Sequence, residues 1–303
     1  MREVCVIGGS RYFGRHLIDL LLAAGDRVTV VNRGSAPAPP GTDHVRADRD
    51  DAAALAGALG DRAFDAVIDQ VCYTPAQAAV AARVFTGRAA RYVMTSTMEV
   101  YAPPTSSALP PTTPGSPLRE DAVDPAAWPV TGDLGDDPAT RYAEGKRQAE
   151  AVLAAAALPT AFVRSAHVLG GGAQDFTGRL AHYTARIAAG EEVLVHPRPQ
   201  PTVFVGHREI AEVLRWAAGA DFTGPVNACS HGEWDAAALS GHIAARLGAR
   251  PPRLRTARDG ETPSPYSFDT YYAMDNSRAA TLGFPFSRTS DWLDAAIDDA
   301  ARA

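Results

Sequence analysis

The most constraining feature of this sequence is a short apolar run that is followed directly by a glycine turn and a helical pattern. The run covers residues 4–7 (VCVI), the turn covers residues 8–14 (GGSRYFG), and an amphipathic pattern continues from Arg15 to Ala24 before Gly25. A buried strand, a glycine turn and a helix in direct succession form the first half of a dinucleotide-binding βαβ unit. The glycines allow a sharp turn, and the N-terminus of the helix can bind a pyrophosphate.

The end of the second predicted strand, residues 27–31, bears on the choice of dinucleotide. An acidic residue after this strand would bind the ribose 2′-hydroxyl of NAD, whereas an arginine suits the 2′-phosphate of NADP. This strand is followed by Asn32 and Arg33, and Arg11 stands in the middle of the glycine turn. The sequence therefore predicts NADP(H) in preference to NAD(H), although either arginine can alternatively be a solvated surface charge. The residues predicted to contact the dinucleotide are Gly8, Ser10, Arg11, Tyr12, Phe13, Gly14, Asn32, Arg33, Asp48, Arg49 and Val71.

The composition gives no indication of a surface for nucleic acid or membrane. The 303 residues are 46% hydrophobic and 21% charged, with a net charge of −6 and both signs mixed along the chain. Cys5, Cys72 and Cys229 form no CxxC pair, which predicts free thiols in a reducing compartment. There is no histidine cluster for a metal, no apolar run near the ~20 residues of a membrane span, and no signal peptide before the first strand. We expect a cytoplasmic protein without a metal.

Apolar strands alternate with amphipathic helices, which predicts an α/β Rossmann fold with a doubly wound parallel sheet. We expect residues 1–170 to form the dinucleotide-binding domain, with 203–228 returning to it, and most of 171–303 to form a smaller, discontinuous substrate lobe. Asp48 and Arg49 either begin a helix or lie beside the adenine. Further strands are expected at 44–47, 64–69, 90–96, 160–164, 203–205 and 226–228, and helices at 48–59, 75–84, 142–157, 176–189, 209–218, 234–247 and 291–301.

A tyrosine, a lysine and a threonine form the proposed reaction centre. Tyr142 and Lys146 are four residues apart on a predicted helix and therefore share one face. A phenol with a pKa near ~10 is a weak base at neutral pH, but a neighbouring ammonium group favours the phenolate. Thr97 ends a predicted strand, where its hydroxyl can hold the oxygen of a substrate while Tyr142 transfers the proton. Residues 103–138, rich in Pro, Ser, Thr and Gly, are predicted to be a loop that walls the substrate.

With these motifs the chain resembles the extended short-chain dehydrogenase/reductases, also called the NAD-dependent epimerase/dehydratase family. The resemblance implies that Thr97, Tyr142 and Lys146 are the catalytic set and that Lys146 also binds the nicotinamide ribose. His167 stands where many members have Asn after an Arg-Pro pair, and here the pair is Arg164-Ser165. In relatives, the helices that correspond to 75–84 and 142–157 form a four-helix interface, which implies a homodimer. The segments that carry the resemblance are 4–14, 64–69, 91–101, 142–150, 164–170, 203–211 and 275–283.

The stretch after Thr97 is the most informative departure from the family pattern. Sugar-nucleotide 4,6-dehydratases that resemble this family carry Thr-Asp-Glu, whereas this chain has Met98 and Glu99. Without the acid at position 98, loss of water lacks a proton donor. Met98 therefore indicates either a partly apolar substrate wall or a core residue, and Glu99 either orients the substrate or is structural. The residues predicted to contact the substrate are Tyr73, Met98, Glu99 and His167. His167, Tyr142 and Lys146 are also predicted to contact the cofactor.

Three functions remain open from the sequence. The first is an NADP(H)-dependent oxidoreductase that interconverts an alcohol and a carbonyl on a small metabolite. The second is a nucleotide-sugar epimerase or dehydratase whose bound cofactor is oxidised and regenerated within one turnover. The third is a non-catalytic cofactor-binding or RNA-associated scaffold, against which the acidic balance and the retained Tyr142 and Lys146 speak. Net consumption of NADPH separates the first two, and a gel shift at physiological salt tests the third.

Overall fold

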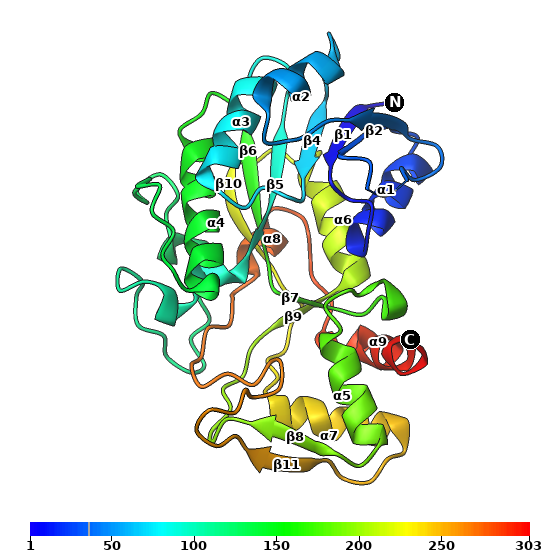
Figure 1. Ribbon diagram of the computed structural model, residues 1–303, viewed down its shortest axis with the longest axis vertical. Helices are drawn as coiled ribbons and strands as arrows, with labels where there is room; N and C mark the ends of the chain where they lie inside the picture. The colour runs from blue at the N-terminus through cyan, green and yellow to red at the C-terminus, as the bar shows by residue number, and fades with distance from the viewer. Residues whose placement is uncertain (36) are drawn as a thin grey trace.

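The computed structural model describes residues 1–35 and 37–303 and contains the predicted doubly wound sheet (Figure 1). Within these residues, seven strands follow the order β10-β6-β5-β4-β1-β2-β3, and every neighbouring pair is parallel. The α/β Rossmann fold expected from the sequence is therefore confirmed. The strands are β1 (Glu3–Ile7), β2 (Arg27–Asn32), β3 (Asp43–Arg46), β4 (Ala66–Asp69), β5 (Tyr92–Thr97), β6 (Thr160–Ser165) and β10 (Gly224–Ala228).

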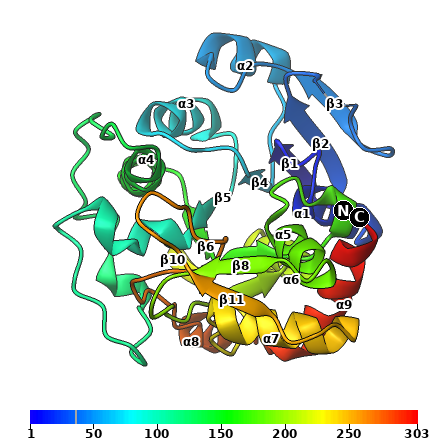
Figure 2. The ribbon, with the colours of Figure 1, turned by 60° about the horizontal axis from the view of Figure 1, so that its bottom comes forward.

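Helices cover both faces of the sheet because its strands are apolar on both sides (Figures 1 and 2). Along β1, Val4 and Val6 join one core, whereas Cys5 and Ile7 join the other. This alternation is the two-residue period of a strand that is buried on both faces. One face is covered by α1 (Phe13–Ala23) and α6 (His207–Ala217), and the other by α2 (Ala52–Leu59), α3 (Pro75–Phe85) and α4 (Pro138–Ala154).

The order of the strands identifies where a ligand binds to such a sheet. From β1 the chain builds outward through β2 to β3, and from β4 it builds in the opposite direction through β5 and β6 to β10. β1 and β4 therefore flank the switch point, and ligands of doubly wound sheets bind outside the carboxyl ends of the strands at this point. The glycine turn follows β1 at this edge, and Asp69 ends β4 there.

A smaller lobe lies below the sheet in Figure 1. Two short parallel strand pairs belong to this part of the chain, β7 (His167–Leu169) with β9 (Phe204–Gly206) and β8 (Glu192–Val195) with β11 (Arg253–Thr256). Because β10 lies in the central sheet, the chain leaves the lobe for the sheet and then returns. Three helices of the lobe share one core: α5 (Arg179–Ala188), α7 (Ala236–Leu247) and α9 (Thr289–Arg302). The short α8 (Ser277–Thr281) packs beside β10 of the central sheet.

Several elements begin or end a few residues away from the sequence expectations, for local reasons. α2 begins at Ala52 rather than at residue 48, because the Asp51 carboxylate accepts hydrogen bonds from Ala53 N and Ala54 N at 2.9 Å, so Asp48 and Arg49 lie before the helix. α4 begins at Pro138 rather than at residue 142, because the Asp137 carboxylate accepts a hydrogen bond from Thr140 N at 2.8 Å and caps the helix. α5 begins at Arg179 rather than at residue 176, because Gly178 before it is in the left-handed region with φ of 62°. β8 (EVLV) and β11 (RLRT) are only four residues long, so neither gives a pattern long enough to predict a strand.

Three further findings concern the whole of the described chain. Cys5, Cys72 and Cys229 are free and buried. Across residues 1–35 and 37–303, no group of three or more His, Cys, Asp or Glu side chains is arranged to hold a metal ion. No helix in these same ranges is both long enough and apolar enough to cross a membrane.

Candidate active site

Thr97, Tyr142 and Lys146 come together at the carboxyl edge of the sheet. Thr97 is the last residue of β5, and Tyr142 and Lys146 lie one turn apart on α4. The Thr97 hydroxyl is close enough to the Tyr142 phenol to lower the pKa of that phenol. The Lys146 ammonium lies 6.0 Å from the centroid of the Tyr142 ring. The structure thus gathers the three residues in one cluster, and their catalytic roles stay a prediction.

Lys146 is buried beneath this cluster. Its Nζ donates a hydrogen bond to the Thr95 carbonyl at 2.8 Å and lies 4.5 Å from the centroid of the Tyr73 ring. Burial lowers the pKa of Lys146 to about 8, against the opposing effects of Cys72 and Asp69. A depressed pKa means that a modest rise in pH above neutral removes the positive charge from the site.

Tyr142 keeps 39% of its surface exposed, although the surrounding protein crowds its phenol. This crowding raises the pKa of Tyr142 to about 12, and the Thr97 hydroxyl and the positive charge of Arg179 act against the rise. Thr97 is itself held in place, because its hydroxyl accepts a hydrogen bond from Glu99 N at 3.2 Å. The phenol is therefore protonated at neutral pH in the protein alone, and further positive charge is needed to make it a base.

A cavity of about 620 Å³ opens between this edge of the sheet and the smaller lobe. Its volume is sufficient for a small metabolite or for a larger, drug-sized molecule. Arg179 and the residues around Tyr266 are contributions of the lobe that sequence inspection missed, because no local pattern marks them. The wall is formed by Glu99 and His167, by Arg179 and Arg186 of α5, and by Tyr266 and Phe268.

Glu99 and His167 both lie beside Tyr272. The Tyr272 hydroxyl lies 3.5 Å from His167 Nε2, and the neighbouring Glu99 carboxylate helps to raise the pKa of Tyr272. Burial raises the pKa of Glu99, against the effects of Arg179 and of Tyr272. Burial also lowers the pKa of His167 to about 3, so its imidazole is neutral at pH 7. His167 stacks on Phe268 with ring centroids 5.2 Å apart, which places it in the cavity wall.

Met98 and Tyr73, also predicted to meet the substrate, have very different surroundings. Met98 is 1% exposed and packs in the core with Val100, so of its two alternatives the core position holds and the substrate wall does not. The 3-10 turn Met98–Tyr101 buries Met98 and leaves the adjacent Glu99 at the cavity. Tyr73 is exposed, and its ring centroid lies 6.2 Å from that of Tyr142.

The glycine turn forms a cradle at the switch point that fits a nicotinamide dinucleotide. Gly8 has φ of 85°, which favours glycine. A Cβ at Gly14 would lie 2.6 Å from Gly9 Cα, so only glycine lets α1 approach the turn this closely. No side chain caps the N-terminus of α1, which is where this motif seats a pyrophosphate.

Unpaired polar atoms along the same edge also fit a polar ligand. Among the described residues, Nε and Nη1 of Arg49, Nε2 of Gln70 and the Thr95 hydroxyl are buried without a hydrogen-bond partner. Buried polar groups of a native protein nearly always have a hydrogen-bond partner, so four such atoms without one indicate that a ligand supplies the partners. Donors and a hydroxyl left open beside a glycine cradle match the phosphates, ribose hydroxyls and amides of a dinucleotide.

Tyr12 and Phe13 take part in packing within the chain. The Tyr12 hydroxyl donates a hydrogen bond to the Val168 carbonyl at 3.3 Å, and its ring stacks on His207 with centroids 6.4 Å apart. Phe13 packs against the core beneath α1. Because the Tyr12 side chain already has partners within the protein, the predicted cofactor contact of Tyr12 would be made mainly by its main chain.

The pair predicted to flank the adenine divides into a surface residue and a buried one. Asp48 is exposed, and its carboxylate accepts a hydrogen bond from Asp50 N at 3.0 Å. Arg49 is buried and forms an ion pair with Asp69, which also accepts hydrogen bonds from the Tyr92 hydroxyl at 2.5 Å and from Val71 N at 2.9 Å. The Asp69 carboxylate therefore holds both Arg49 and Val71 at the switch point.

Asn32 organises the end of β2 where an acidic residue would select NAD. Its Nδ2 donates to the Ser10 hydroxyl at 3.0 Å, and its Oδ1 accepts from Gly34 N at 2.7 Å. His44 Nε2 lies 2.9 Å from the same oxygen. The Asn32 side chain is thus committed to partners within the protein.

Three arginines surround this point. Arg11 and Arg33 are exposed, and so is Arg46, which is the register partner of Asn32 on β3. A Cβ at Gly34 would lie 2.6 Å from Arg46 Nη2, so that guanidinium sits against the Arg33–Gly34 turn. Within residues 1–35 and 37–303, none of the three side chains forms a hydrogen bond or an ion pair. The sequence analysis did not predict Arg46 at this site, although a basic residue at the end of the third strand could have indicated it.

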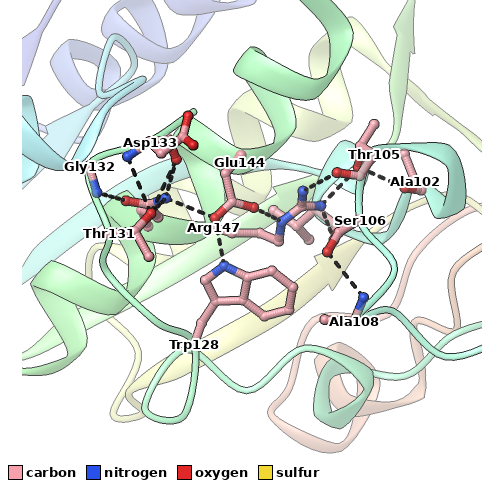
Figure 3. Close-up of polar contacts among 12 residues, drawn as sticks. Ala102, Thr105, Ser106, Ala108, Trp128, Thr131, Gly132, Asp133, Glu144 and Arg147 are labelled. Carbon is pink, nitrogen blue, oxygen red and sulfur yellow. Dashed lines mark hydrogen bonds and ion pairs between the residues drawn. The ribbon is translucent and has the colours of Figure 1, made fainter. Parts of the chain in front are cut away.

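Arg147 ties α4 to the loop that follows β5 (Figure 3). Its buried guanidinium donates to the Val100 carbonyl at 3.0 Å, to the Thr105 hydroxyl at 3.1 Å and to Glu144 at 2.8 Å. It also lies 4.9 Å from the centroid of the Trp128 ring, whose Nε1 donates to Glu144 at 3.0 Å. The segment 98–137 is therefore fastened directly beside Thr97 and Tyr142.

Rossmann topology, a phosphate cradle and a Thr/Tyr/Lys cluster together characterise a nicotinamide-dependent enzyme of the oxidoreductase type. The chain belongs to the NAD dependent epimerase/dehydratase family, whose model matches residues 4–220. The family resemblance drawn from the sequence is thereby confirmed. Family membership also favours an enzyme over a non-catalytic scaffold.

One curated relative and several solved structures are similar to this chain. 2′-dehydrokanamycin reductase of Streptomyces kanamyceticus is 35% identical over 127 residues, which are 41% of this chain and 36% of that protein. The match therefore spans only about a third of the relative's length.

The structural similarities extend over nearly all of both chains and show the fold. The Bordetella bronchiseptica enzyme WbmH in complex with NAD⁺ is 19% identical, with a TM-score of 0.71 over 100% of this chain and 98% of its own. UDP-glucose 4-epimerase from Thermotoga maritima with UDP-glucose is 16% identical, with a TM-score of 0.74 over 99% and 97%. UDP-glucose 4-epimerase of Thermus thermophilus with NAD is 19% identical, with a TM-score of 0.71 over 99% of each chain.

Proposed function

We propose that this protein is an NADP(H)-dependent oxidoreductase that interconverts an alcohol and a carbonyl on a small metabolite. The observation that carries the proposal is the cluster of Thr97 and Tyr142 above the buried Lys146, next to a cavity of about 620 Å³. A hydroxyl, a phenol and an ammonium in this arrangement can hold a substrate oxygen and move a proton to or from it.

The residues divide the work as follows. The Thr97 hydroxyl and the Tyr142 phenol bind the reacting oxygen, and Tyr142 donates its proton to that oxygen during reduction or accepts it during oxidation. Lys146, with Arg179, supplies the positive charge that favours the phenolate. The nicotinamide, when bound along the glycine turn and Lys146, supplies or accepts the hydride. Glu99 orients the substrate, because it lines the cavity next to Tyr272.

The preference for NADP(H) is supported by charge at the end of β2. Arg11, Arg33 and Arg46 are exposed there, and the position that would bear an acid in an NAD enzyme is Asn32. Guanidinium groups bind phosphate through charge-assisted, often bidentate hydrogen bonds. NAD, which lacks the 2′-phosphate, leaves these three charges without a partner.

A nucleotide-sugar epimerase is the second candidate. The names of the solved structures described above favour it, and the guanidinium group of Arg179 in the cavity wall is compatible with a phosphate. The dehydratase branch of this alternative loses support, because Met98 is in the core and offers no acid. The name of the curated relative, a reductase, favours the first candidate.

A cofactor-consumption assay separates the two candidates. The purified protein is incubated with NADPH, or separately with NADH, and a panel of aldehydes, ketones and UDP-sugars, and both absorbance and products are followed. We expect stoichiometric loss of NADPH with a carbonyl substrate, and slower loss of NADH. Conversion of a UDP-sugar to its epimer without net loss of cofactor would establish the alternative and overturn the proposal.

A further inference from the structure

The charges that line the cavity do not balance. Among the described residues of its wall, Glu99 is the one carboxylate, whereas Arg179 and Arg186 both bring guanidinium groups. The two imidazoles in the wall add no positive charge near neutral pH, because burial lowers the pKa of both His167 and His182. The cavity therefore carries an excess of positive charge.

The two guanidinium groups have different surroundings. Arg186 is committed within the lobe, because its Nε donates to the Glu192 carbonyl at 2.7 Å and its Nη1 lies 3.6 Å from Glu191. Arg179 forms no ion pair with any described residue; it is exposed, and it lies 6.0 Å from the centroid of the Tyr266 ring. Only Arg179 thus has its charge available to a bound molecule.

Arg179 lines the same cavity as Glu99 and His167. Its charge lowers the pKa values of Tyr142, Glu99 and His167, in each case against or beside the larger effect of burial. These residues surround the place where the substrate oxygen would be held. An acidic group bound to Arg179 and a carbonyl near Tyr142 can therefore belong to one small molecule.

We propose that Arg179 anchors an acidic group of the substrate, a carboxylate or a phosphate, and selects acidic substrates over neutral and cationic ones. The identity of the bound molecule as a substrate rests on the proposed function, whereas the binding of an acidic group by Arg179 does not. A guanidinium group pairs with either anion through two parallel hydrogen bonds, which fixes orientation as well as affinity. A cationic substrate would instead meet an uncompensated like charge in a confined space.

The test compares matched pairs of aldehydes that differ only near the acidic group. Succinic semialdehyde against butyraldehyde reports on a carboxylate, and glyceraldehyde 3-phosphate against glyceraldehyde reports on a phosphate. Binding is measured by calorimetry to Tyr142→Phe loaded with NADPH, so that no turnover intervenes, and kcat/KM is measured with the unmodified enzyme. We expect the acidic member of at least one pair to bind roughly 10- to 100-fold more tightly than its neutral partner.

Variants of the two arginines separate anchoring from general damage. Arg179→Gln should reduce the acidic-to-neutral ratio to about one, and Arg179→Lys should keep part of it. Arg186→Gln is the matched control and should retain the preference, because that guanidinium is occupied by Glu191 and Glu192. The ratio is informative because simple structural damage weakens both members of a pair together.

The outcomes distinguish this inference from the proposed function. Acid-selective binding that depends on Arg179, without NADPH consumption, supports the anchor and counts against the oxidoreductase. NADPH consumption with equal binding of acidic and neutral aldehydes overturns the anchor alone. A preference that survives Arg179→Gln, or that Arg186→Gln abolishes equally, also overturns it.

Discussion

Removal of the Arg147 guanidinium should loosen the part of the segment 98–137 that packs on α4 around Thr105 and Trp128. Arg147 is buried and donates hydrogen bonds to the carbonyls of Val100 and Thr105, to the Thr105 hydroxyl and to the Glu144 carboxylate, at distances between 2.8 and 3.3 Å (Figure 3). Arg147→Met keeps most of the apolar stem that lies over Trp128 but none of the donors. The variant therefore leaves buried acceptors unpaired while disturbing the volume of the core little.

The expected cost follows from these contacts. A hydrogen bond to a charged group contributes about 1.5–3 kcal/mol, and breaking a buried ion pair by removal of one partner costs about 3–5 kcal/mol. Glu144 retains its bonds from Trp128 Nε1 at 3.0 Å and from Gln148 Nε2 at 2.9 Å, so its own loss is partly compensated. We expect Arg147→Met to lower the free energy of unfolding by about 3–5 kcal/mol, and Arg147→Lys by roughly half as much.

Urea unfolding and limited proteolysis measure the two consequences. Arg91 provides the control, since it too donates to a backbone carbonyl, that of Phe222 at 2.6 Å, and lies 5.0 Å from the centroid of the Phe222 ring, at the other end of β5. Arg91→Met should also lose stability. Only Arg147→Met should become more sensitive to protease within residues 106–133, because of these two arginines only Arg147 contacts this segment. Gln148 and Arg164 continue to hold residues 131–133 and 120–123, so the increase should be local.

Two results would refute this reasoning. One is an Arg147→Met protein whose free energy of unfolding lies within about 1 kcal/mol of the parent, since the buried acceptors would then have found other donors. The other is cleavage within residues 106–133 at the same rate in both variants, which would mean that the network of Figure 3 does not hold the segment.

Four further outcomes are expected. Tyr142→Phe should lower turnover by roughly 10²–10⁴ with NADPH affinity little changed, and near-normal rates would exclude Tyr142 as the acid/base. Burial lowers the pKa of Lys146 to about 8, so between pH 8 and about 10 the folded protein binds fewer protons than the unfolded chain. The free energy of unfolding should therefore rise with pH in this range, and urea titrations of Lys146→Met should lack that rise. Arg33→Asp should weaken NADPH relative to NADH in fluorescence titrations, whereas equal affinities in the unmodified protein would contradict the NADP preference. Light scattering at micromolar concentration should report a homodimer, and a monomer would exclude it.

Local features of the sequence determined the class of fold and the catalytic candidates. The strand, glycine turn and helix of residues 4–24 are contiguous, and the four-residue spacing of Tyr142 and Lys146 fixes a shared helical face wherever the helix packs. The alternation of strands and helices then restricts the sheet to a parallel, doubly wound form. The inferences about the fold need only short-range periodicity, which explains why they hold without knowledge of distant contacts. The catalytic roles of Tyr142 and Lys146 stay a prediction.

The tertiary structure decided what surrounds these residues. Arg46 reaches the end of β2 through strand register, and Tyr272 meets His167 across 105 positions of sequence. Met98 was ambiguous in the sequence because an apolar residue at a strand end suits both a core and a substrate wall, and only the packed 3-10 turn resolves the choice. The free charge of Arg179 is of the same kind, because whether an arginine is paired depends on which acidic residues the fold brings near it.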